Sequence, residues 1–338
     1  MSVKYSEPVK LFSFRNQRRE DGKDEYIFGE KLFPVYNSYI GNLNLSYNLK
    51  SKVEIHLKKP YTSKIVSHWD VMAYIQDTVD MSLKQITDNA DVVCYRSFLT
   101  DLALLPLGGT LSNTFVAFLH NGIVFIEKVQ TPIYPITVKD IEKEYMKKNF
   151  ARICTLVNSK ESVDMKSSVN LDEKYYTTKT RVFKMSNSTI KVMFTGEVYA
   201  ITRNYSSEES NFMDVKVCTG NLAHLYNGMC LYHTWAKNYI DGNKWIIVGI
   251  TGTRKHQLRK IQLVTLSDLE SKLPLPVPRI MEYVGKSLEN IVNTCRRFPK
   301  KYVIIPHDKF SLRVADKETV ESMYYSKPTS SFVESFPE

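Results

Sequence analysis

Apolar and polar residues recur along this chain with spacings that predict both helices and strands. Helical spacing of apolar residues predicts helices over 63–86, 138–157, 224–240 and 278–298. In the first of these, the stripe expected to face the core consists of Ile65, Val71, Ile75, Val79 and Leu83. β-rich runs predict strands over 91–107, 174–185, 190–201, 212–220 and 300–315, and two hairpins, one over 114–129 turned at Asn121-Gly122 and one over 244–266 turned around Gly252.

This mixture of elements indicates an α/β chain in which helices cover the faces of a mixed sheet system. The chain has 338 residues, of which 43% are hydrophobic and 12% aromatic, and that is enough to bury a substantial core. We expect a single domain over residues 1–338, with residues 1–35 as a charged, peripheral N-terminal segment.

The cysteines favour a reducing compartment, because their number is odd and no two are spaced as C-x-x-C. They are Cys94, Cys154, Cys218, Cys230 and Cys295. No apolar run suggests a signal peptide or a membrane span, so we expect a nuclear or cytoplasmic protein that is neither secreted nor bound to a membrane. Cys218 is expected to fill a small buried space rather than to act as a nucleophile.

Basic residues exceed acidic residues, and the formal net charge is +10 at a pI of about 9.1. This balance favours an anionic partner, of which nucleic acid is the commonest kind. The alternative is charge that is spread over the surface and only keeps the protein soluble. The seven histidines form no H-x-x-x-H or H-x-H pair, which argues against a zinc site.

Six motifs between residues 91 and 265 follow one another in an order that is specific as a set. They are Tyr95-Arg96 with Thr100, NGIVFIEKVQTP, FTGEVYA, DVKVCTG, WAKNYIDG, and the pair WIIVGITG and LRKIQLVTL. In this order they resemble the DXO-type non-canonical decapping family, whose members are hydrolases of RNA 5′-end quality control. The resemblance implies an α/β fold with two mixed β-sheets, flanked by helices, around a central pocket.

The resemblance also implies which residues should form the site. In that family, acidic side chains hold a divalent metal against a 5′ phosphate or cap linkage, and a lysine and a glutamine complete the site. By this resemblance, Arg96 and Glu197 keep the residue types of the family. Ala151 stands at a helix glutamate, and Tyr199 stands at the aspartate of an E-x-D strand. Lys216 and Cys218 stand at the glutamate and the lysine of an E-x-K strand, and Lys237 stands at the glutamine. Because Mg²⁺ and Mn²⁺ need several oxygen ligands, Glu197 alone would be a poor anchor.

Residues two apart on a strand share a face, so Glu197 and Tyr199 should enter one pocket. The resemblance implies that Arg96, Lys216, Lys237 and Tyr199 could bind RNA phosphate there. We expect Glu197 to pair with Lys216 rather than to bind metal. Arg96 could face the pocket or be a structural ion-pair partner within the sheet, and Tyr199 could be a core residue or a stacking surface for a base.

These substitutions favour a protein that binds RNA 5′ ends but has lost metal-dependent hydrolysis, as in degenerate relatives such as insect Cutoff or divergent nematode paralogues. No cofactor is then expected. One alternative is an active decapping hydrolase or 5′–3′ exonuclease that uses Mg²⁺ or Mn²⁺ at a rearranged site. Another is a protein-interaction scaffold with a vestigial pocket. A protein partner in RNA processing is compatible with each interpretation.

Overall fold

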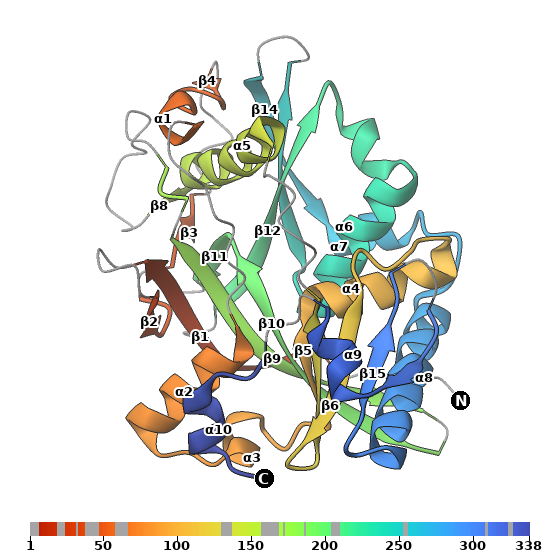
Figure 1. Cartoon of the computed structure of the whole chain (residues 1–338). Helices are drawn as coiled ribbons and strands as arrows, with labels where there is room; N and C mark the ends of the chain where they lie inside the picture. The colour runs from red at the N-terminus through yellow and green to blue at the C-terminus, as the bar shows by residue number, and fades with distance from the viewer. Residues whose placement is uncertain are drawn as a thin grey trace.

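Two β-sheets of mixed strand direction organise the chain, as the computed structural model shows (Figure 1). The described residues are 7–18, 24–31, 33–37, 47–57, 67–129, 137–156, 169–171, 173–185, 187–203, 210–252, 256–307, 310–323 and 327–338. Among them, no helix is both long and apolar enough to cross a bilayer. The two mixed sheets expected from the family resemblance are confirmed by these strand arrangements.

The first sheet has nine strands in the order β16-β15-β6-β7-β5-β10-β9-β1-β2. Their bounds are Arg313–Ala315, Tyr302–Ile305, Phe115–His120, Ile123–Lys128, Val92–Tyr95, Thr189–Val198, Lys174–Lys184, Val9–Arg18 and Asp24–Phe28. Strand β10 pairs parallel with β5 and antiparallel with β9. The N-terminal segment thus supplies two strands at one edge of this sheet, and Phe14 of β1 is fully buried.

The second sheet has seven strands in the order β4-β14-β13-β12-β11-β3-β8. Their bounds are Tyr47–Asn48, Gln257–Thr265, Trp245–Thr251, Ser210–Thr219, Ala200–Arg203, Val35–Tyr36 and Thr155–Leu156. Strand β11 follows β10 after the single residue Tyr199, so one nearly continuous stretch of backbone passes from the first sheet into the second.

Helices cover both faces of each sheet because the buried strands present apolar side chains on both sides. Helices α4 (Arg96–Leu104), α6 (Gly228–Asp241), α7 (Leu266–Glu270) and α8 (Val277–Arg297) share one large core with both sheets. Helices α2 (His68–Val79), α3 (Leu83–Ile86) and α10 (Ser330–Ser335) cover the other face of the first sheet, around Trp69 and Phe125. Helix α5 (Val138–Cys154) covers the other face of the second sheet, and the remaining short helices are α1 (Glu54–Leu57), η2 (Leu105–Leu107), η3 (Leu222–Tyr226) and α9 (Lys317–Glu321).

Several local predictions are confirmed. Asn121 and Gly122 both have positive φ, at 49° and 80°, and join β6 to β7 as the Asn-Gly pair predicts. The helices predicted over 138–157, 224–240 and 278–298 are present as α5, α6 and α8, although α5 ends at Cys154. All five cysteines are free.

Two local predictions are wrong. Residues 91–107 are not a long β-rich run, because β5 stops at Tyr95 and α4 starts at Arg96, where Leu99, Leu102 and Ala103 form a buried helical stripe. The helix predicted over 63–86 is divided into α2 and α3 after Asp80, which has a left-handed φ of 53°; Ile65 lies outside the described residues. Val79 is exposed rather than facing the core.

Candidate functional site

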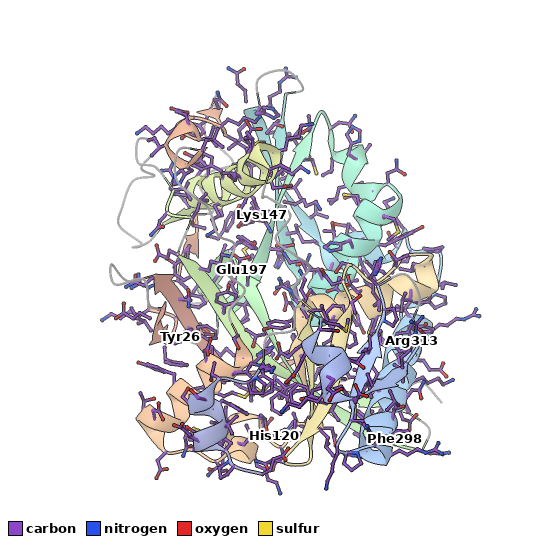
Figure 2. All side chains as sticks on the ribbon, in the orientation of Figure 1. Tyr26, His120, Lys147, Glu197, Phe298 and Arg313 are labelled. Carbon is purple, nitrogen blue, oxygen red and sulfur yellow. The ribbon has the colours of Figure 1, made fainter. Side chains whose placement is uncertain are left out.

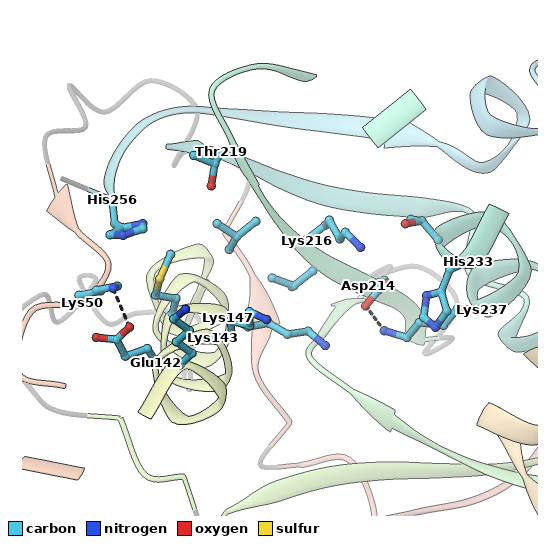
Figure 3. A pocket seen from close by; sticks show the side chains of 15 residues that line it. Lys50, Glu142, Lys143, Lys147, Asp214, Lys216, Thr219, His233, Lys237 and His256 are labelled. Atoms are coloured by element: carbon cyan, nitrogen blue, oxygen red, sulfur yellow. Dashed lines mark hydrogen bonds and ion pairs between the residues drawn. The ribbon is translucent and has the colours of Figure 1, made fainter. Parts of the chain in front are cut away.

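A pocket of about 560 Å³ lies between α5 and α6, along an open edge of β12 (Figure 3). Strand β11 pairs with β12 only up to Met213, whereas β13 pairs with it as far as Thr219. From Asp214 onward, therefore, one edge of β12 has no partner strand in the described part of the chain. We name this space the lysine pocket because its lining includes Lys50, Lys139, Lys143, Lys147, Lys216 and Lys237.

Helix α5 supplies a row of cations to one wall of the pocket. Lys139, Lys143 and Lys147 are spaced four residues apart, and residues with that spacing lie on one helix face. Among the described residues, the carboxylates that line the pocket are Glu142 and Asp214, and Glu142 is ion-paired with Lys50 at 2.8 Å. The pocket therefore carries a strong excess of positive charge.

Helix α6 supplies the opposite wall, and Lys237 on this helix forms an ion pair with Asp214 of β12. The Lys237 Nζ atom lies 2.5 Å from Asp214 Oδ1 (Figure 3), and Asn238 donates to Asp214 Oδ2 at 3.2 Å. Burial lowers the pKa of Lys237 to about 8, helped by the nearby charges of Lys147 and Arg96. Burial alone would raise the pKa of Asp214, but Lys237 and Lys147 hold it well below its usual range. The Asp214 carboxylate is thus kept ionised, and its two oxygens accept from Lys237 and Asn238.

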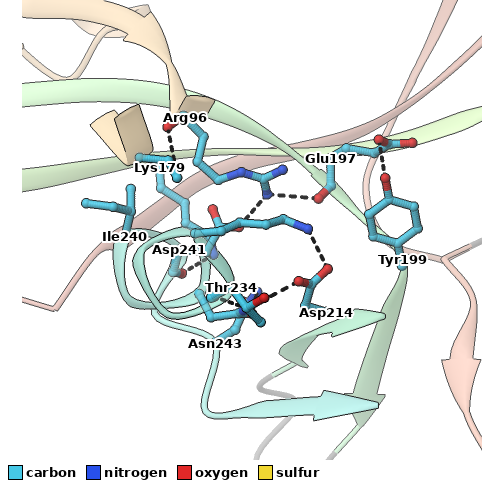
Figure 4. Close-up of polar contacts among 12 residues, drawn as sticks. Arg96, Lys179, Glu197, Tyr199, Asp214, Thr234, Ile240, Asp241 and Asn243 are labelled. Atoms are coloured by element: carbon cyan, nitrogen blue, oxygen red, sulfur yellow. Dashed lines mark hydrogen bonds and ion pairs between the residues drawn. The ribbon is translucent and has the colours of Figure 1, made fainter. Parts of the chain in front are cut away.

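Glu197 and Tyr199 meet at the junction between β10 and β11. The Tyr199 hydroxyl donates to Glu197 Oε2 at 2.5 Å (Figure 4), so the two side chains share one face as expected. The expectation that both enter the pocket is wrong, because its described lining includes neither of them. Lys147 Nζ lies 3.9 Å from the centre of the Tyr199 ring, and Lys237 Nζ lies 5.2 Å from it. Both distances are within the range of cation–π attraction. In the view of Figure 2, Lys147 extends from α5 into the interior above Glu197.

Electrostatics keep the Glu197 carboxylate ionised. Burial alone would raise the pKa of Glu197, but the charges of Lys147, Lys148 and Lys174 and the hydrogen bond from Tyr199 lower it below its usual value. Lys216 is not among these groups, and no ion pair joins Lys216 to Glu197, both of which lie in the part of the chain that the structure describes. The predicted Glu197–Lys216 pair is therefore wrong, because Lys147 of α5 provides the nearby cation instead.

Arg96 is a structural residue behind the pocket rather than part of its lining. Its Nη1 atom donates to the Asp241 carboxylate and, at 3.0 Å, to the carbonyl oxygen of Glu197. A Cβ atom added at Gly196 would lie 2.6 Å from Arg96 Nη1, so this glycine makes room for the guanidinium group. Of the two interpretations of Arg96, the structure supports the ion-pair partner.

Two further buried cations fix the end of α6. Lys179 donates to the Asp241 carbonyl at 2.5 Å, and Arg181 donates to the Tyr239 carbonyl at 2.6 Å. Cations at a helix C-terminus satisfy carbonyl groups that have no partner within the helix. Together with Arg96 they anchor α6 on the first sheet, and this sets the position from which Lys237 reaches Asp214.

The residues around the lysine pocket do not fit a divalent metal. Among the described residues, no group of three or more His, Cys, Asp or Glu side chains is arranged to hold one. In the pocket lining, Asp214 is paired with Lys237 and Glu142 with Lys50. At the junction between the sheets, Glu197 accepts from Tyr199. Ala151, which the resemblance placed at a glutamate, lies in an apolar cluster with Phe150 and Tyr199. The described residues therefore provide no preformed site for a divalent metal.

The remaining predicted site residues separate into pocket and core. Lys216 and Lys237 line the pocket, whereas Tyr199 lies beneath the ammonium groups of Lys147 and Lys237. Cys218 is buried in the large apolar core, and burial raises the pKa of its thiol. The sequence reasoning missed Lys147 and Asp214, although the four-residue lysine spacing in α5 was a signal for the first.

Comparisons with known proteins agree with this fold. Residues 6–322 match the family described as RAI1-like PD-(D/E)XK nuclease. Scheffersomyces stipitis Rai1, solved with (3′-NADP)+ and a calcium ion, is 17% identical with a TM-score of 0.75, over 99% of this chain and 97% of that chain. Candida albicans Rai1, solved with pU5-Mn²⁺, has the same identity and TM-score, over 98% of this chain and 95% of that chain.

A more distant structure, Dxo1 of K. lactis in complex with manganese, is 10% identical with a TM-score of 0.60, over 93% of this chain and 91% of that chain. A comparison with curated protein sequences finds no match.

The (D/E)XK part of the family name stands for a triplet of an acidic residue, any residue and a lysine. Asp214-Val215-Lys216 has that form, and both Asp214 and Lys216 line the lysine pocket. The family resemblance described under the sequence analysis had placed this triplet two residues further along the chain, at Lys216-Val217-Cys218. The structure favours Asp214-Val215-Lys216 as the triplet, because Cys218 lies in the core. From the match over nearly its whole length, this chain belongs to the RAI1-like PD-(D/E)XK nuclease family.

Proposed function

We propose that this protein binds the phosphorylated 5′ end of RNA in the lysine pocket without metal-dependent hydrolysis. The observation that carries the proposal is the state of two carboxylates, Asp214 in the pocket lining and Glu197 at the junction between β10 and β11. Glu197 is held by Tyr199 and Asp214 by Lys237, while the lysines around them supply excess positive charge. Such a site attracts phosphate but offers few free oxygen ligands to a metal.

The ligands of related structures support RNA or a nucleotide as the class of ligand. The relative from Candida albicans was solved with pU5 and Mn²⁺, and the relative from Scheffersomyces stipitis with (3′-NADP)+ and calcium. An RNA 5′ end in the nucleus or cytoplasm is the anion that best fits both these ligands and the net charge of +10.

A second candidate is a metal-dependent hydrolase of RNA 5′ ends. The triplet Asp214-Val215-Lys216 beside Glu197 favours it, because an acidic residue and a lysine at this spacing match the family description. In this case the ion pair between Asp214 and Lys237 would have to open when metal and substrate bind.

The two candidates are separated by one experiment on short RNAs of identical sequence. Their 5′ ends would carry hydroxyl, monophosphate, triphosphate, methylated or unmethylated cap, or NAD, with Mg²⁺, Mn²⁺ or EDTA. Fluorescence anisotropy measures binding, and gel electrophoresis detects product. We expect tighter binding of phosphorylated ends and no product above that of Glu197→Gln and Asp214→Asn prepared in the same way.

Product formation that disappears in both variants would establish the hydrolase instead. Salt dependence provides an independent check of the binding mode, because log affinity for a single strand should fall with log salt by about 0.7 per phosphate contacted. An affinity that does not change with salt, or the absence of any binding, would favour a protein-interaction scaffold.

A further inference from the structure

Lys147 occupies a central position among the charged groups beside the pocket. Its charge is among the causes that shift the pKa values of Glu197, Asp214 and Lys237. Its ammonium group also lies 3.9 Å from the centre of the Tyr199 ring. One cation thus stands close to two carboxylates and an aromatic face, where it offsets the negative charge of both carboxylates.

The Tyr199 ring is well suited to hold that cation. Its hydroxyl donates to the Glu197 carboxylate, which raises the electron density of the ring and strengthens the attraction of a cation above its face. Lys237 lies 5.2 Å from the same ring, so two ammonium groups share one aromatic support. A divalent ion at this place would meet repulsion from both of them.

The hydrogen-bond donors of Lys147 remain available to a ligand. Lys237 is paired with Asp214 and Lys50 with Glu142, but within the described ranges no ion pair engages Lys147. Its cation–π contact uses the charge of the ammonium group and leaves N–H donors for phosphate oxygens. Lys139 and Lys143 continue the row toward the pocket mouth, so further phosphate groups would find cations at helical spacing.

We propose that Lys147, held on Tyr199, is a built-in cation that binds the terminal phosphate of the ligand in place of a divalent metal. This inference rests on the proposed binding function and adds that binding is independent of metal. The ligand class is a 5′-phosphorylated nucleic acid end whose terminal phosphate reaches between Lys147 and Lys237.

The test measures the affinity of the full-length chain for one short RNA with a 5′ phosphate and for the same RNA with a 5′ hydroxyl. Each titration is made in EDTA, in Mg²⁺ and in Mn²⁺. We expect the preference for the phosphate to be the same in EDTA as with either metal. Lys147→Met should reduce that preference about tenfold or more, which corresponds to the loss of one charge-assisted contact.

Two further variants make the result specific. Lys147→Arg keeps the charge and should retain most of the preference. Lys286→Met removes an exposed lysine of α8 that pairs only with Glu282 among the described residues, and it should change nothing. Thermal melts of all three variants check that each is folded.

A preference that needs Mg²⁺ or Mn²⁺, or one that survives in folded Lys147→Met, would overturn the inference while leaving RNA binding intact. Equal affinity for phosphate and hydroxyl ends in the wild-type protein under every condition would overturn the proposed function as well. The two failures are therefore distinguishable within one set of titrations.

Discussion

The ammonium group of Lys237 lies 2.5 Å from the carboxylate of Asp214, and both side chains are almost completely buried where they meet. Removing one partner of a buried ion pair leaves the other charge without compensation. We therefore expect Asp214→Asn to lower the free energy of unfolding by about 3 kcal/mol, measured by urea denaturation.

The matched control for this prediction is Glu282→Gln. It breaks an exposed ion pair with Lys286 in α8, and exposed pairs contribute little to stability because solvent screens them. The double variant Asp214→Asn with Lys237→Met should recover part of the lost stability. Equal losses in Asp214→Asn and Glu282→Gln would show that the buried ion pair contributes no more to the free energy of unfolding than the exposed one.

The lowered pKa of Lys237, about 8, predicts that phosphate affinity falls as the pH rises through that value. The second ionisation of a phosphate monoester has a pKa of about 6, so the charge of the 5′ phosphate is nearly constant above pH 7. An RNA of adenine and cytosine alone avoids the bases that lose a proton near the top of this range. Anisotropy titrations from pH 7 to 9.5 at fixed ionic strength measure the effect. Lys237→Arg should move the decline beyond this range, and a flat wild-type profile would contradict the prediction.

The same group should change stability in the opposite direction. Because the pKa of Lys237 is lower in the folded protein than the usual 10.5, the unfolded state binds more protons between about pH 8 and 10.5. The contribution of Lys237 to the free energy of unfolding therefore rises with pH in that window. The difference between the wild type and Lys237→Met isolates this contribution from that of Lys179, whose pKa is also lowered to about 8 by burial.

Arg96 should matter for folding and not directly for binding. Arg96→Ala leaves the buried Asp241 carboxylate without its ion-pair partner, and we expect a loss of about 3–5 kcal/mol in the free energy of unfolding. Gly196→Ala should destabilise the protein by about 1–3 kcal/mol, since the added methyl group displaces the guanidinium group. Titrations at low temperature, where the variants remain folded, should give nearly wild-type affinity for a 5′-phosphorylated RNA. A large loss of affinity with unchanged stability would return Arg96 to the pocket.

Glu127 of β7 predicts a pH effect far from the pocket. Burial raises its pKa to about 8, against a favourable hydrogen bond from Tyr95. The folded state therefore keeps a proton that the unfolded state releases above about pH 4.5, and this contribution to stability falls as the pH rises toward 8. Glu127→Gln should be more stable than the wild type at pH 7.5 and lose this advantage at pH 5, as measured by urea midpoints. An equal difference at both pH values would contradict the assigned protonation.

Local patterns predicted much of the fold because they depend on neighbouring residues. The Asn121-Gly122 turn is one case, since positive φ at both positions is a property of these two residues. Helix α4 was missed because the β-branched residues Val92 and Val93 run directly into Arg96 without a side-chain cap or a break. Leu99, Leu102 and Ala103 carried the helical period, but only their burial against other elements makes it decisive.

The site was less predictable because it depends on contacts between distant segments. No local pattern reveals that β11 stops pairing with β12 at Met213 and leaves the edge beside Asp214 open. Lys147 reaches Tyr199 only because α5 packs on that face of the second sheet. The spacing of Glu197 and Tyr199 did predict their shared face, since two residues apart along a strand point to the same side, whereas their hydrogen bond is a finding of the structure.

One stretch of backbone runs from β10 through Tyr199 into β11 and so joins the two sheets covalently beside the pocket. The large apolar core that both sheets share opposes a movement of one sheet away from the other. The pocket is therefore a preformed receptor. A ligand would enter without a movement of whole lobes, and only the lysine side chains, which rearrange within nanoseconds, would need to adjust.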